Sequence, residues 1–324
     1  MNNLCWFKDI TKHDVSIAGG KGASLGELTR AGIRVPPGFV VPAGAFDQFV
    51  GETMIKEEII ARLAEAKPED INSIERASVV LRDVFHDTPM PKDLSEEILK
   101  AFDALGAEFV AVRSSATAED SQIASWAGEL ETYLNTTRDN LLENVKQCWS
   151  SLFTPRAIFY RHEKDLIDAQ VSVAVVVQTM AQAELSGVAF TVHPVTEDTD
   201  QMIIEAVYGL GEAIVGGLVT PDSYIVSKSK NILLDIAIGG QKRKLTKGNE
   251  GNAWVELSEA EGNRQKLSGR QIMELGSICK NIEAHYGFPC DIEWAYADGK
   301  FFITQSRPIT TLKKRASLPA SSAD

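Results

Sequence analysis

The sequence contains few of the patterns that mark disulfide-rich or metal-histidine proteins. Its four cysteines, Cys5, Cys148, Cys279 and Cys290, form no Cys-x-x-Cys pair, which argues against a disulfide framework and against a structural zinc site. The five histidines lack the His-x-x-x-His and His-Glu-x-x-His spacings of metal-dependent hydrolases. We therefore interpret the cysteines as buried thiols and expect no histidine-bound metal.

The sequence is also short of positive charge and of long apolar runs. Its formal net charge is -12 at pH 7, from 33 Lys and Arg against 45 Asp and Glu. Proteins that bind nucleic acid non-specifically neutralise its phosphates with a basic surface, so that function is not expected here. No apolar run approaches the length of a membrane span, and the start MNNLCWFKDI has no leader pattern. We therefore predict a cytoplasmic protein in which any phosphate site is local.

The order of apolar segments predicts a mixed α and β fold. With 324 residues, of which 44% are apolar, the chain is long enough for two lobes with a cleft between them. Residues 45–104 carry apolar positions at helical spacing, so we predict a helical insert there. Strands are predicted in EFVAVRSSA, VSVAVVVQTM, SGVAFTV, MIIEAV and NILLDIAI. The ending KKRASLPASSAD is small and polar, and we expect a flexible tail or linker.

The glycine cluster in GGKGASLGEL is a candidate phosphate-binding turn that contains Lys21. Glycines let backbone amides approach a phosphate closely, and the helix that follows offers more unpaired amides at its positive end. The segment does not match the P-loop pattern, so a P-loop is not predicted. An ordinary solvated lysine at a helix start is the alternative.

A second candidate is the loop in VAVRSSATAED, which opens with Arg113 and continues with Ser114, Ser115 and Thr117. The planar guanidinium of arginine suits phosphate oxygens, and neighbouring hydroxyls could complete the cradle. A helix cap with an exposed arginine is the alternative interpretation.

The segment DIEWAYADGKFFITQSRP predicts two strands joined at an Asp-Gly turn, and the length of that turn decides which polar side chains meet. A two-residue loop, Asp298-Gly299, would put Glu293 opposite Thr304. Because side chains alternate along a strand, Gln305 would then lie on the other face.

A three-residue loop over 297–299, with its glycine in the left-handed conformation, puts Asp291 opposite Gln305. The same register aligns Glu293 with Arg307. Oxygen ligands for magnesium would then lie beside a cation for a phosphate, which phosphoryl transfer requires. We therefore predict the three-residue loop; a polar sheet face in water is the alternative.

Two further segments could line a nucleotide site. Gln178, Thr179 and Met180 end a predicted strand, and their exposed backbone could form the hinge edge with which an adenine ring pairs. Gly209, Gly211 and Glu212 follow the strand MIIEAV in GLGEAIVGG. An ordinary strand end and tight glycine packing are the respective alternatives.

Taken in order, these segments resemble a known family. They are GGKGASLGEL, VPPGF, AVRSSATAED, SWAGELETYLN, CWSSLFTPRAIFYR, SGVAFTVHPVT, YGLGEAIVGG, HYGFPCDIEWA and ITQSRPIT. The set is similar to the ATP-binding domain shared by phosphoenolpyruvate synthase, pyruvate phosphate dikinase and rifampin phosphotransferase. The resemblance extends to about Leu312.

The resemblance implies an ATP-grasp fold in which two lobes hold ATP and magnesium in the cleft between them. The expected domains are an N-terminal lobe over 1–192 with the helical insert, a C-terminal lobe over 193–312 with a metal-binding hairpin, and a tail or linker over 313–324.

The resemblance also implies roles for the candidate residues. The family's phosphate-binding positions match Lys21, Arg113 and Arg307, and its magnesium ligands match Glu293 and Gln305. The nucleotide-binding set, which lines the pocket or lies beside the metal, is Ser114, Ser115, Thr117, Gly128, Thr132, Gln178, Thr179, Met180, Glu212 and Asp291.

Members of the family pass a phosphoryl group from ATP to a histidine on a mobile domain, which carries it to a final acceptor. None of the five histidines lies in a segment that resembles the family's phosphohistidine loop, Thr-Gly-Gly-x-x-x-His, and we interpret His162 and His193 as structural. We therefore expect a stand-alone subunit, as in phenylphosphate synthase, or one domain of a larger enzyme. The final acceptor would be pyruvate, a phenol or an antibiotic hydroxyl.

Two other functions fit the same residues. The chain could be a nucleotide-sensing subunit that closes on ATP without chemistry. It could also be an ATP-grasp ligase that phosphorylates a carboxylate directly. ATP turnover with a histidine-bearing partner, and activity without one, distinguish these functions from the phosphotransferase.

Overall fold

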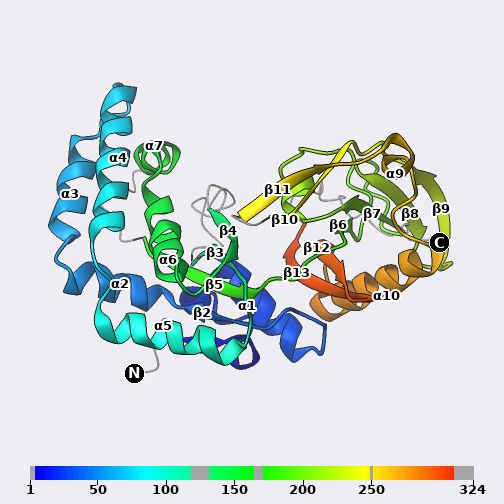
Figure 1. Ribbon diagram of the computed structural model, residues 1–324, viewed down its shortest axis with the longest axis horizontal. Helices are drawn as coiled ribbons and strands as arrows, with labels where there is room; N and C mark the ends of the chain where they lie inside the picture. The colour runs from blue at the N-terminus through cyan, green and yellow to red at the C-terminus, as the bar shows by residue number, and fades with distance from the viewer. Residues whose placement is uncertain (1–3, 118–130, 164–170, 249–250, 310–324) are drawn as a thin grey trace, which may run out of the picture.

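Two large antiparallel sheets, lying side by side and flanked by helices, organise the protein (Figure 1). The computed structural model describes residues 4–117, 131–163, 171–248 and 251–309. We call the five-stranded sheet and its helices the first lobe, and the six-stranded sheet and its helix the second lobe. This arrangement confirms the predicted mixed α/β fold with two lobes.

The first lobe is built around a central strand that is buried on both faces. The order of its sheet is β1 (Cys5–Trp6), β2 (Gly38–Val41), β5 (Val173–Thr179), β3 (Val110–Ala116) and β4 (Thr132–Thr136). Along β5, Val175 and Val177 join the large core of the lobe, whereas Ala174 and Val176 pack on the opposite face. Burial of both faces explains why this strand is a continuous apolar run rather than an alternating one.

The predicted helical insert is present as four helices, and further helices complete the core of the first lobe. The aromatic rings of Phe49 and Trp149, whose centroids lie 5.1 Å apart, are at its centre. None of the helices in the described ranges is long and apolar enough to cross a membrane. The insert comprises α2 (Ala43–Glu52), α3 (Lys56–Glu65), α4 (Ile71–Asp87) and α5 (Lys92–Leu105), and α6 (Leu141–Ser150) and α7 (Pro155–Glu163) follow.

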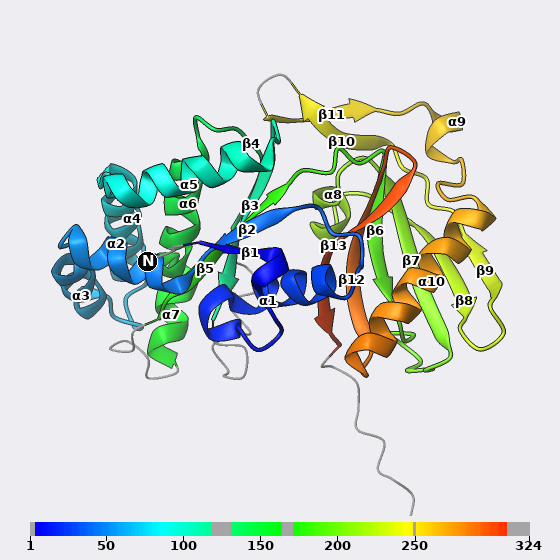
Figure 2. The same cartoon turned by 90° about the horizontal axis from the view of Figure 1, so that it is seen from below.

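The second lobe packs one long helix, α10 (Gly269–Tyr286), on a six-stranded sheet (Figure 2). The strand order is β13 (Lys300–Pro308), β12 (Cys290–Ala297), β6 (Leu185–Phe190), β7 (Gln201–Tyr208), β8 (Asp222–Ser227) and β9 (Ile232–Ala237). The short helices α8 (Glu212–Val215) and α9 (Glu259–Gly262) lie in its connections. Strand β6 pairs within this sheet although it precedes residue 193, and the division into domains at 192/193 stays a prediction.

Helix α1 (Val15–Arg30) belongs to both lobes, which Figure 2 shows by its position between the two sheets. Its Leu25 is buried against β2 and β5, and its Leu28 is buried in the core of the second lobe. The helix is broken at Gly19, whose φ of 67° lies in the left-handed region. The predicted glycine loop is therefore a single break within a helix rather than a separate turn.

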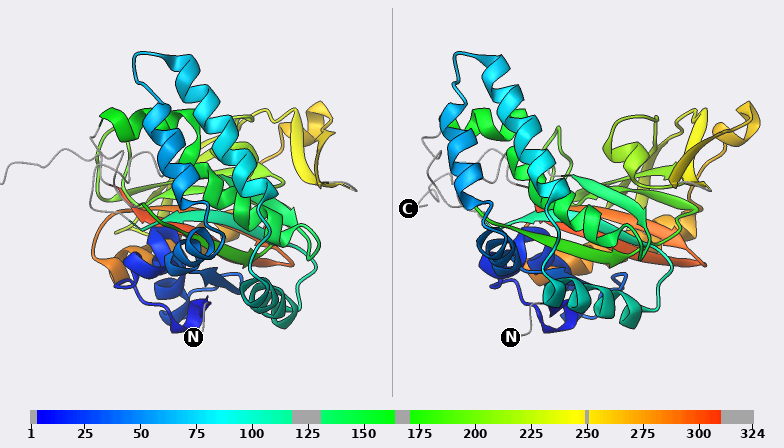
Figure 3. Two further views of the ribbon diagram at one scale, coloured as in Figure 1. Left: turned by 90° about the vertical axis from the view of Figure 1, so that its left-hand side faces the viewer. Right: turned by 60° about the vertical axis from the view of Figure 1, so that its left-hand side comes forward.

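A hairpin of β10 (Arg243–Gly248) and β11 (Gly251–Glu256) extends from the second lobe toward the first, and Figure 3 shows it from two further sides. It was not predicted, because the segment RKLTKGNEGNAWVE has no regular alternation of apolar residues. Its Leu245 forms a bridge with Gly209. A Cβ on Gly209 would lie 2.2 Å from the Leu245 carbonyl oxygen, so tight packing accounts for this glycine.

The turn between β12 and β13 differs from its prediction. Ala297 pairs with Lys300, which leaves a two-residue loop of Asp298 and Gly299. Both loop residues have positive φ, 51° and 72°, as in the type I′ turn that Asp-Gly favours in a tight hairpin. The predicted three-residue loop is therefore wrong.

A bulge in the same hairpin nevertheless brings the expected side chains together. The register shifts between Glu293 and Trp294, so that Glu293 pairs with Gln305 while Trp294 pairs with Ile303. Thr304 is the extra residue. Asp291 consequently faces Arg307, and the predicted pairing of Asp291 with Gln305 is also wrong. The turn sequence sets the register only for the residues between the turn and the bulge, so the bulge could not be deduced from it.

Candidate functional site

Two neighbouring cavities lie where the lobes meet, one on each side of the segment from Thr304 to Gln305. The hinge cavity, of about 180 Å³, is lined by Arg113, Thr132, Leu134, Gln178, Thr179, Met180, Glu212 and Glu293, among others. The Arg307 cavity, of about 420 Å³, is lined by Lys12, His13, Lys21, Ser24, Tyr286, Phe288, Gln305 and Arg307, among others.

Arg113 links the two lobes at this junction. It extends from β3, and its Nη1 donates to the Thr304 carbonyl oxygen at 3.0 Å. Its Nη2 donates to Gln305 Oε1 at 2.6 Å and to Glu293 Oε2 at 3.3 Å. Two side-chain oxygens thus converge on one cationic nitrogen. Such a point, between a carboxylate and an amide oxygen, suits an oxygen-seeking cation.

Arg113 also has hydrogen-bonding capacity that its neighbours do not use. Its side chain is only 11% exposed, and its Nε is buried without a hydrogen-bond partner. A buried donor of this kind is costly unless a ligand or a water satisfies it. This supports a site in which an anion completes the environment of the guanidinium.

Lys21 is held at the same junction by the first lobe. Its Nζ donates to the Ser114 carbonyl oxygen at 3.0 Å. Burial lowers the pKa of Lys21 to about 8, and the nearby Arg113 guanidinium acts in the same direction, whereas Glu293 opposes it. A lysine with this pKa is charged near neutral pH, and a bound anion would raise its pKa again.

Arg307 and Asp291 form an ion pair beside the Arg307 cavity. The Nε and Nη2 atoms of Arg307 both lie 2.8 Å from Asp291 Oδ2. Burial raises the pKa of Asp291, while the Arg307 charge partly offsets that effect. The Arg307 side chain is 62% exposed, so its guanidinium remains accessible to a further anion.

The hydroxyl groups that follow Arg113 donate hydrogen bonds to backbone carbonyl oxygens of the protein. Ser114 Oγ donates to the Glu131 carbonyl oxygen at 3.1 Å, and Thr117 Oγ1 donates to the Ser172 carbonyl oxygen at 3.0 Å. Ser115 is fully buried and donates to the Ala18 carbonyl oxygen at 2.9 Å. Arg113, Ser114 and Ser115 lie in strand β3, so the predicted loop does not open at Arg113, and these hydroxyls tie β3 and its end to neighbouring segments, among them helix α1. Gly128, also in the predicted set, lies outside the described residues.

Gln178, Thr179 and Met180 line the hinge cavity, but the backbone N–H groups of Thr179 and Met180 are already hydrogen-bonded. The backbone N–H of Thr179 donates to the Pro37 carbonyl oxygen at 2.8 Å, and that of Met180 donates to the Phe109 carbonyl oxygen at 3.0 Å. The predicted exposed backbone is therefore wrong for both N–H groups, because β5 ends between two other segments. The Thr179 hydroxyl is buried without a partner in the cavity wall.

Two asparagines that connect to Glu212 of the hinge cavity were not predicted as site residues. Asn252 Nδ2 donates to Glu212 Oε2 at 2.9 Å, and Asn135 donates through its Nδ2 to Asn252 Oδ1. Asn135 ends the segment SWAGELETYLN but was not singled out there, and Asn252 lies in a stretch without a recognisable motif. The left-handed φ of Asn135, 51°, becomes visible only in the structure.

The structure gathers most of the predicted residues around one junction. Within the described ranges, no group of three or more His, Cys, Asp or Glu side chains has the arrangement of a metal site. The residues that line the hinge cavity are Arg113, Thr132, Gln178, Thr179, Met180, Glu212 and Glu293, and those that line the Arg307 cavity are Lys21, Gln305 and Arg307. Neither cavity is lined by Ser114, Ser115, Thr117 or Asp291.

Comparisons with known proteins agree with this picture. The family described as pyruvate phosphate dikinase, AMP/ATP-binding domain, matches residues 15–324. A probable phosphoenolpyruvate synthase of Archaeoglobus fulgidus is 48% identical over 317 residues, which cover 96% of this chain and 42% of that protein. A probable phosphoenolpyruvate synthase of Methanocaldococcus jannaschii is 45% identical over 322 residues, or 97% of this chain and 27% of that protein.

A rifampicin phosphotransferase of Bacillus cereus is 40% identical over 312 residues, which cover 94% of this chain and 36% of that protein. The chain therefore spans less than half the length of these curated relatives. Among solved structures, D-alanyl-alanine synthetase A of Vibrio cholerae aligns with a TM-score of 0.29 at 11% identity, over 72% of this chain and 54% of that chain. A common fold does not follow from so low a score.

Proposed function

The chain belongs to the family of the pyruvate phosphate dikinase AMP/ATP-binding domain, and on this premise we propose that it binds ATP with magnesium and phosphorylates a histidine of another domain or subunit. That histidine would then pass the phosphoryl group to pyruvate, a phenol or an antibiotic hydroxyl. We also propose that the two lobes form an ATP-grasp fold. The observation that carries the proposal is the convergence of Glu293 and Gln305 on Arg113 between two cavities.

The nucleoside would occupy the hinge cavity and the triphosphate the junction. The hinge cavity offers apolar walls from Leu134 and Met180 and the carboxylate of Glu212. Arg113, which lines this cavity, and Lys21, which lines the Arg307 cavity, supply positive charge for the phosphates. Positioning and neutralisation of this kind are the main contributions of a protein to phosphoryl transfer.

The side chains at the junction fit magnesium. Glu293 Oε2 and Gln305 Oε1 already converge on a positively charged nitrogen, and oxygen ligands are those that magnesium prefers. Glu293 and Gln305 would hold the ion, which would supply positive charge beside the phosphates. Arg113, which holds both oxygens in this structure, would then be available to the phosphates.

The phosphoryl acceptor would approach through the Arg307 cavity. The attacking and leaving atoms lie roughly in line in a phosphoryl transfer, so the acceptor must come from the side opposite the nucleoside. The Arg307 cavity lies on that side and contains Lys21 and Arg307. The rings of Tyr286 and Phe288, with centroids 5.3 Å apart, form part of its wall.

Calorimetric titration with ATP, with and without magnesium, tests the site. We expect magnesium-dependent binding that is lost in Glu293→Ala and kept in Glu274→Ala, a control on the exposed surface of α10. Unchanged binding in Glu293→Ala would refute the metal assignment.

A transfer assay with radiolabelled ATP tests the chemistry. The remaining part of the Archaeoglobus fulgidus relative, beyond the segment that matches this chain, serves as the acceptor chain. We expect acid-labile, base-stable label on that chain, as phosphohistidine gives. Binding without label on any acceptor would favour the nucleotide sensor, and label passed directly to a carboxylate would favour the ligase.

A further inference from the structure

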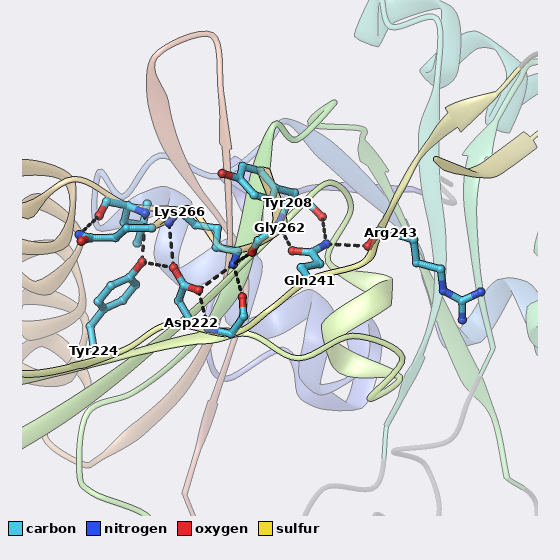
Figure 4. Close-up of polar contacts among 10 residues, drawn as sticks. Tyr208, Asp222, Tyr224, Gln241, Arg243, Gly262 and Lys266 are labelled. Atoms are coloured by element: carbon cyan, nitrogen blue, oxygen red, sulfur yellow. Dashed lines mark hydrogen bonds and ion pairs between the residues drawn. The ribbon is translucent and has the colours of Figure 1, made fainter. Parts of the chain in front are cut away.

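The β10–β11 hairpin is fixed at its base to the second lobe by a fully buried ion pair (Figure 4). Lys266 Nζ lies 2.8 Å from Asp222 Oδ1, and both side chains have no solvent exposure. The same Nζ donates to the carbonyl oxygens of Gly239 and Gly262, at 2.6 and 2.9 Å. Tyr224 donates its hydroxyl to Asp222 Oδ2 at 2.7 Å. Because every charge here has partners, the network holds the segment around the hairpin rigidly.

Gln241 extends this hydrogen-bond network to Arg243, the first residue of the hairpin. Its Oε1 accepts from the backbone N–H of Tyr208 at 2.8 Å, and its Nε2 donates to the carbonyl oxygens of Tyr208 and Arg243 at 3.0 and 2.9 Å (Figure 4). The hairpin is thereby tied to strand β7 of the second sheet. Any movement of the second lobe would carry the hairpin with it.

One face of the hairpin is directed at the first lobe. Lys247 and Asn252 are cross-strand partners, so their side chains share a face. Lys247 Nζ lies 3.7 Å from Glu108 Oε1 and 3.4 Å from the ring centroid of Phe109, both of the first lobe. The hairpin therefore bridges the lobes without belonging to the first one.

Asn252 is the centre of a chain of side-chain hydrogen bonds between the lobes. Gln182 Nε2 donates to Asn135 Oδ1 at 3.0 Å, Asn135 Nδ2 donates to Asn252 Oδ1, and Asn252 Nδ2 donates to Glu212 Oε2 at 2.9 Å. Ionised Glu212 can only accept, so the Asn252 amide must turn its NH₂ to Glu212 and its oxygen to Asn135. The direction of every amide in the chain follows from that one carboxylate.

We propose that the β10–β11 hairpin is a clasp that holds the lobes closed over the hinge cavity, with Asn252 as the residue that positions Glu212 for the bound nucleoside. The positioning role rests on the proposed function, whereas the clasp itself does not. Glu212 lines the hinge cavity together with Thr132 and Leu134, which lie on β4, the strand that also contains Asn135. Closing the clasp therefore fixes the wall of the hinge cavity that Glu212, Thr132 and Leu134 form. Opening it requires the Asn135–Asn252 hydrogen bond to break.

The clasp can be tested without nucleotide by measuring the distance between the lobes. Spin labels are placed on cysteines substituted for Lys100 on α5 and Glu259 on α9, both exposed, in a Cys5→Ser background. Asn252→Asp sets a carboxylate against Glu212 and should lengthen and broaden the distance distribution. Thr246→Ala, on the other face of the hairpin, should leave it unchanged.

A compensating variant makes this test specific. In Asn252→Asp with Glu212→Gln, the new amide can donate to the new carboxylate, which still accepts from Asn135. We expect this pair to restore the closed distribution. If Asn252→Asp leaves the distances as in the unsubstituted protein, or if the pair fails to restore them, the clasp is refuted whether or not ATP binds.

A double-mutant cycle on ATP affinity tests the positioning role. Asn252→Ala should weaken ATP binding about 10-fold, the range expected for a hydrogen bond to a charged group, and should have no further effect once Glu212 is alanine. Additive losses would refute action through Glu212. Failure of the unsubstituted protein to bind ATP would instead refute the proposed function and leave the distance measurement to decide the clasp.

Discussion

Arg113 is a side chain of the first lobe that contacts the second lobe directly. Its guanidinium makes three polar contacts with the second lobe, to Thr304, Glu293 and Gln305. Lysine has the charge but not the planar fork, so it cannot keep these contacts simultaneously. The residue thus combines a stabilising role in the free protein with the proposed phosphate-binding role.

Arg113→Ala should therefore affect both stability and binding. We expect a loss of about 1–3 kcal/mol in the free energy of unfolding, because Glu293 and Gln305 lose a charged partner in a partly buried site. ATP binding should fall about 10- to 100-fold, with Arg113→Lys recovering only part. Urea denaturation and calorimetry measure the two effects, and full recovery by lysine would contradict the argument.

Lys21 makes nucleotide binding sensitive to pH near its pKa of about 8. Below that pH the ammonium is charged and attracts phosphate; as pH rises through 8 in the free protein it becomes neutral. A bound triphosphate favours the charged form, so binding near pH 8 should take up a proton. Calorimetry in buffers of different ionisation enthalpy detects that uptake. Lys21→Arg should abolish it, and uptake that persists in this variant would assign it to another group.

The sequence pointed to residues that meet at one junction but not to their hydrogen-bond partners, and the roles of these residues stay predictions. Arg113, Glu293 and Gln305 could be predicted as candidates because phosphate and magnesium require cations and oxygen ligands. The fate of Ser115 could not, since its hydroxyl bonds to Ala18, 97 positions earlier in the chain. A contact across that distance depends on how α1 packs on β3, which no local pattern encodes.

At the scale of elements, the break in α1 shapes the site. A Cβ on Gly19 would lie 2.2 Å from Ser115 Oγ, and the left-handed φ of 67° disfavours any side chain. The break lets the first turn of the helix approach β3 closely. Lys21, two residues later, thereby reaches the Ser114 carbonyl oxygen.

Gly19→Ala should destabilise the protein by at least about 1–2 kcal/mol, the usual cost of a left-handed conformation outside glycine, and should weaken ATP binding. Gly276→Ala is the matched control, because Gly276 lies within helix α10 and a Cβ there has nothing within 4 Å. That control should be stabilising by about 0.5–1 kcal/mol. Thermal unfolding of both variants provides the comparison. Equal effects of the two substitutions would show that the break is not strained.

Elements with a clear apolar period were predictable, and irregular ones were not. The helical insert, β5 and α10 all carry continuous apolar or helical patterns. The bulge at Glu293 and the β10–β11 hairpin lack such a pattern, because a bulge is set by pairing across strands and the hairpin is held by Asp222 and Lys266 at its base. The candidate site was predictable to the extent that it lies on regular strands.

At the scale of the whole molecule, the lobes share one helix. The core of the second lobe contains Leu28, and Ile33 packs against it from the same part of the chain. The backbone N–H of Ile303 in β13 also donates to the Arg34 carbonyl oxygen at 2.9 Å. The second lobe is therefore complete only with a segment that precedes it by about 150 residues.

A fragment over 181–309 should consequently fail to fold alone. Burial of a leucine side chain contributes about 1.5–3 kcal/mol, and the fragment would lack Leu28 and its neighbours. Addition of a peptide over 15–35 should restore a cooperative thermal transition, and a peptide with Leu28→Asp should not. A cooperative transition of the fragment without any peptide would disprove the dependence.

The shared helix also restricts how such a chain can be cut and recombined. A gene that carried only the second lobe would encode an incomplete core, so the two lobes cannot be exchanged between proteins as separate modules. During synthesis, the segment that completes the second lobe leaves the ribosome long before the rest of that lobe. Its apolar surface must therefore stay beside the first lobe until the second lobe is synthesised, and α1 becomes the template on which the second lobe assembles.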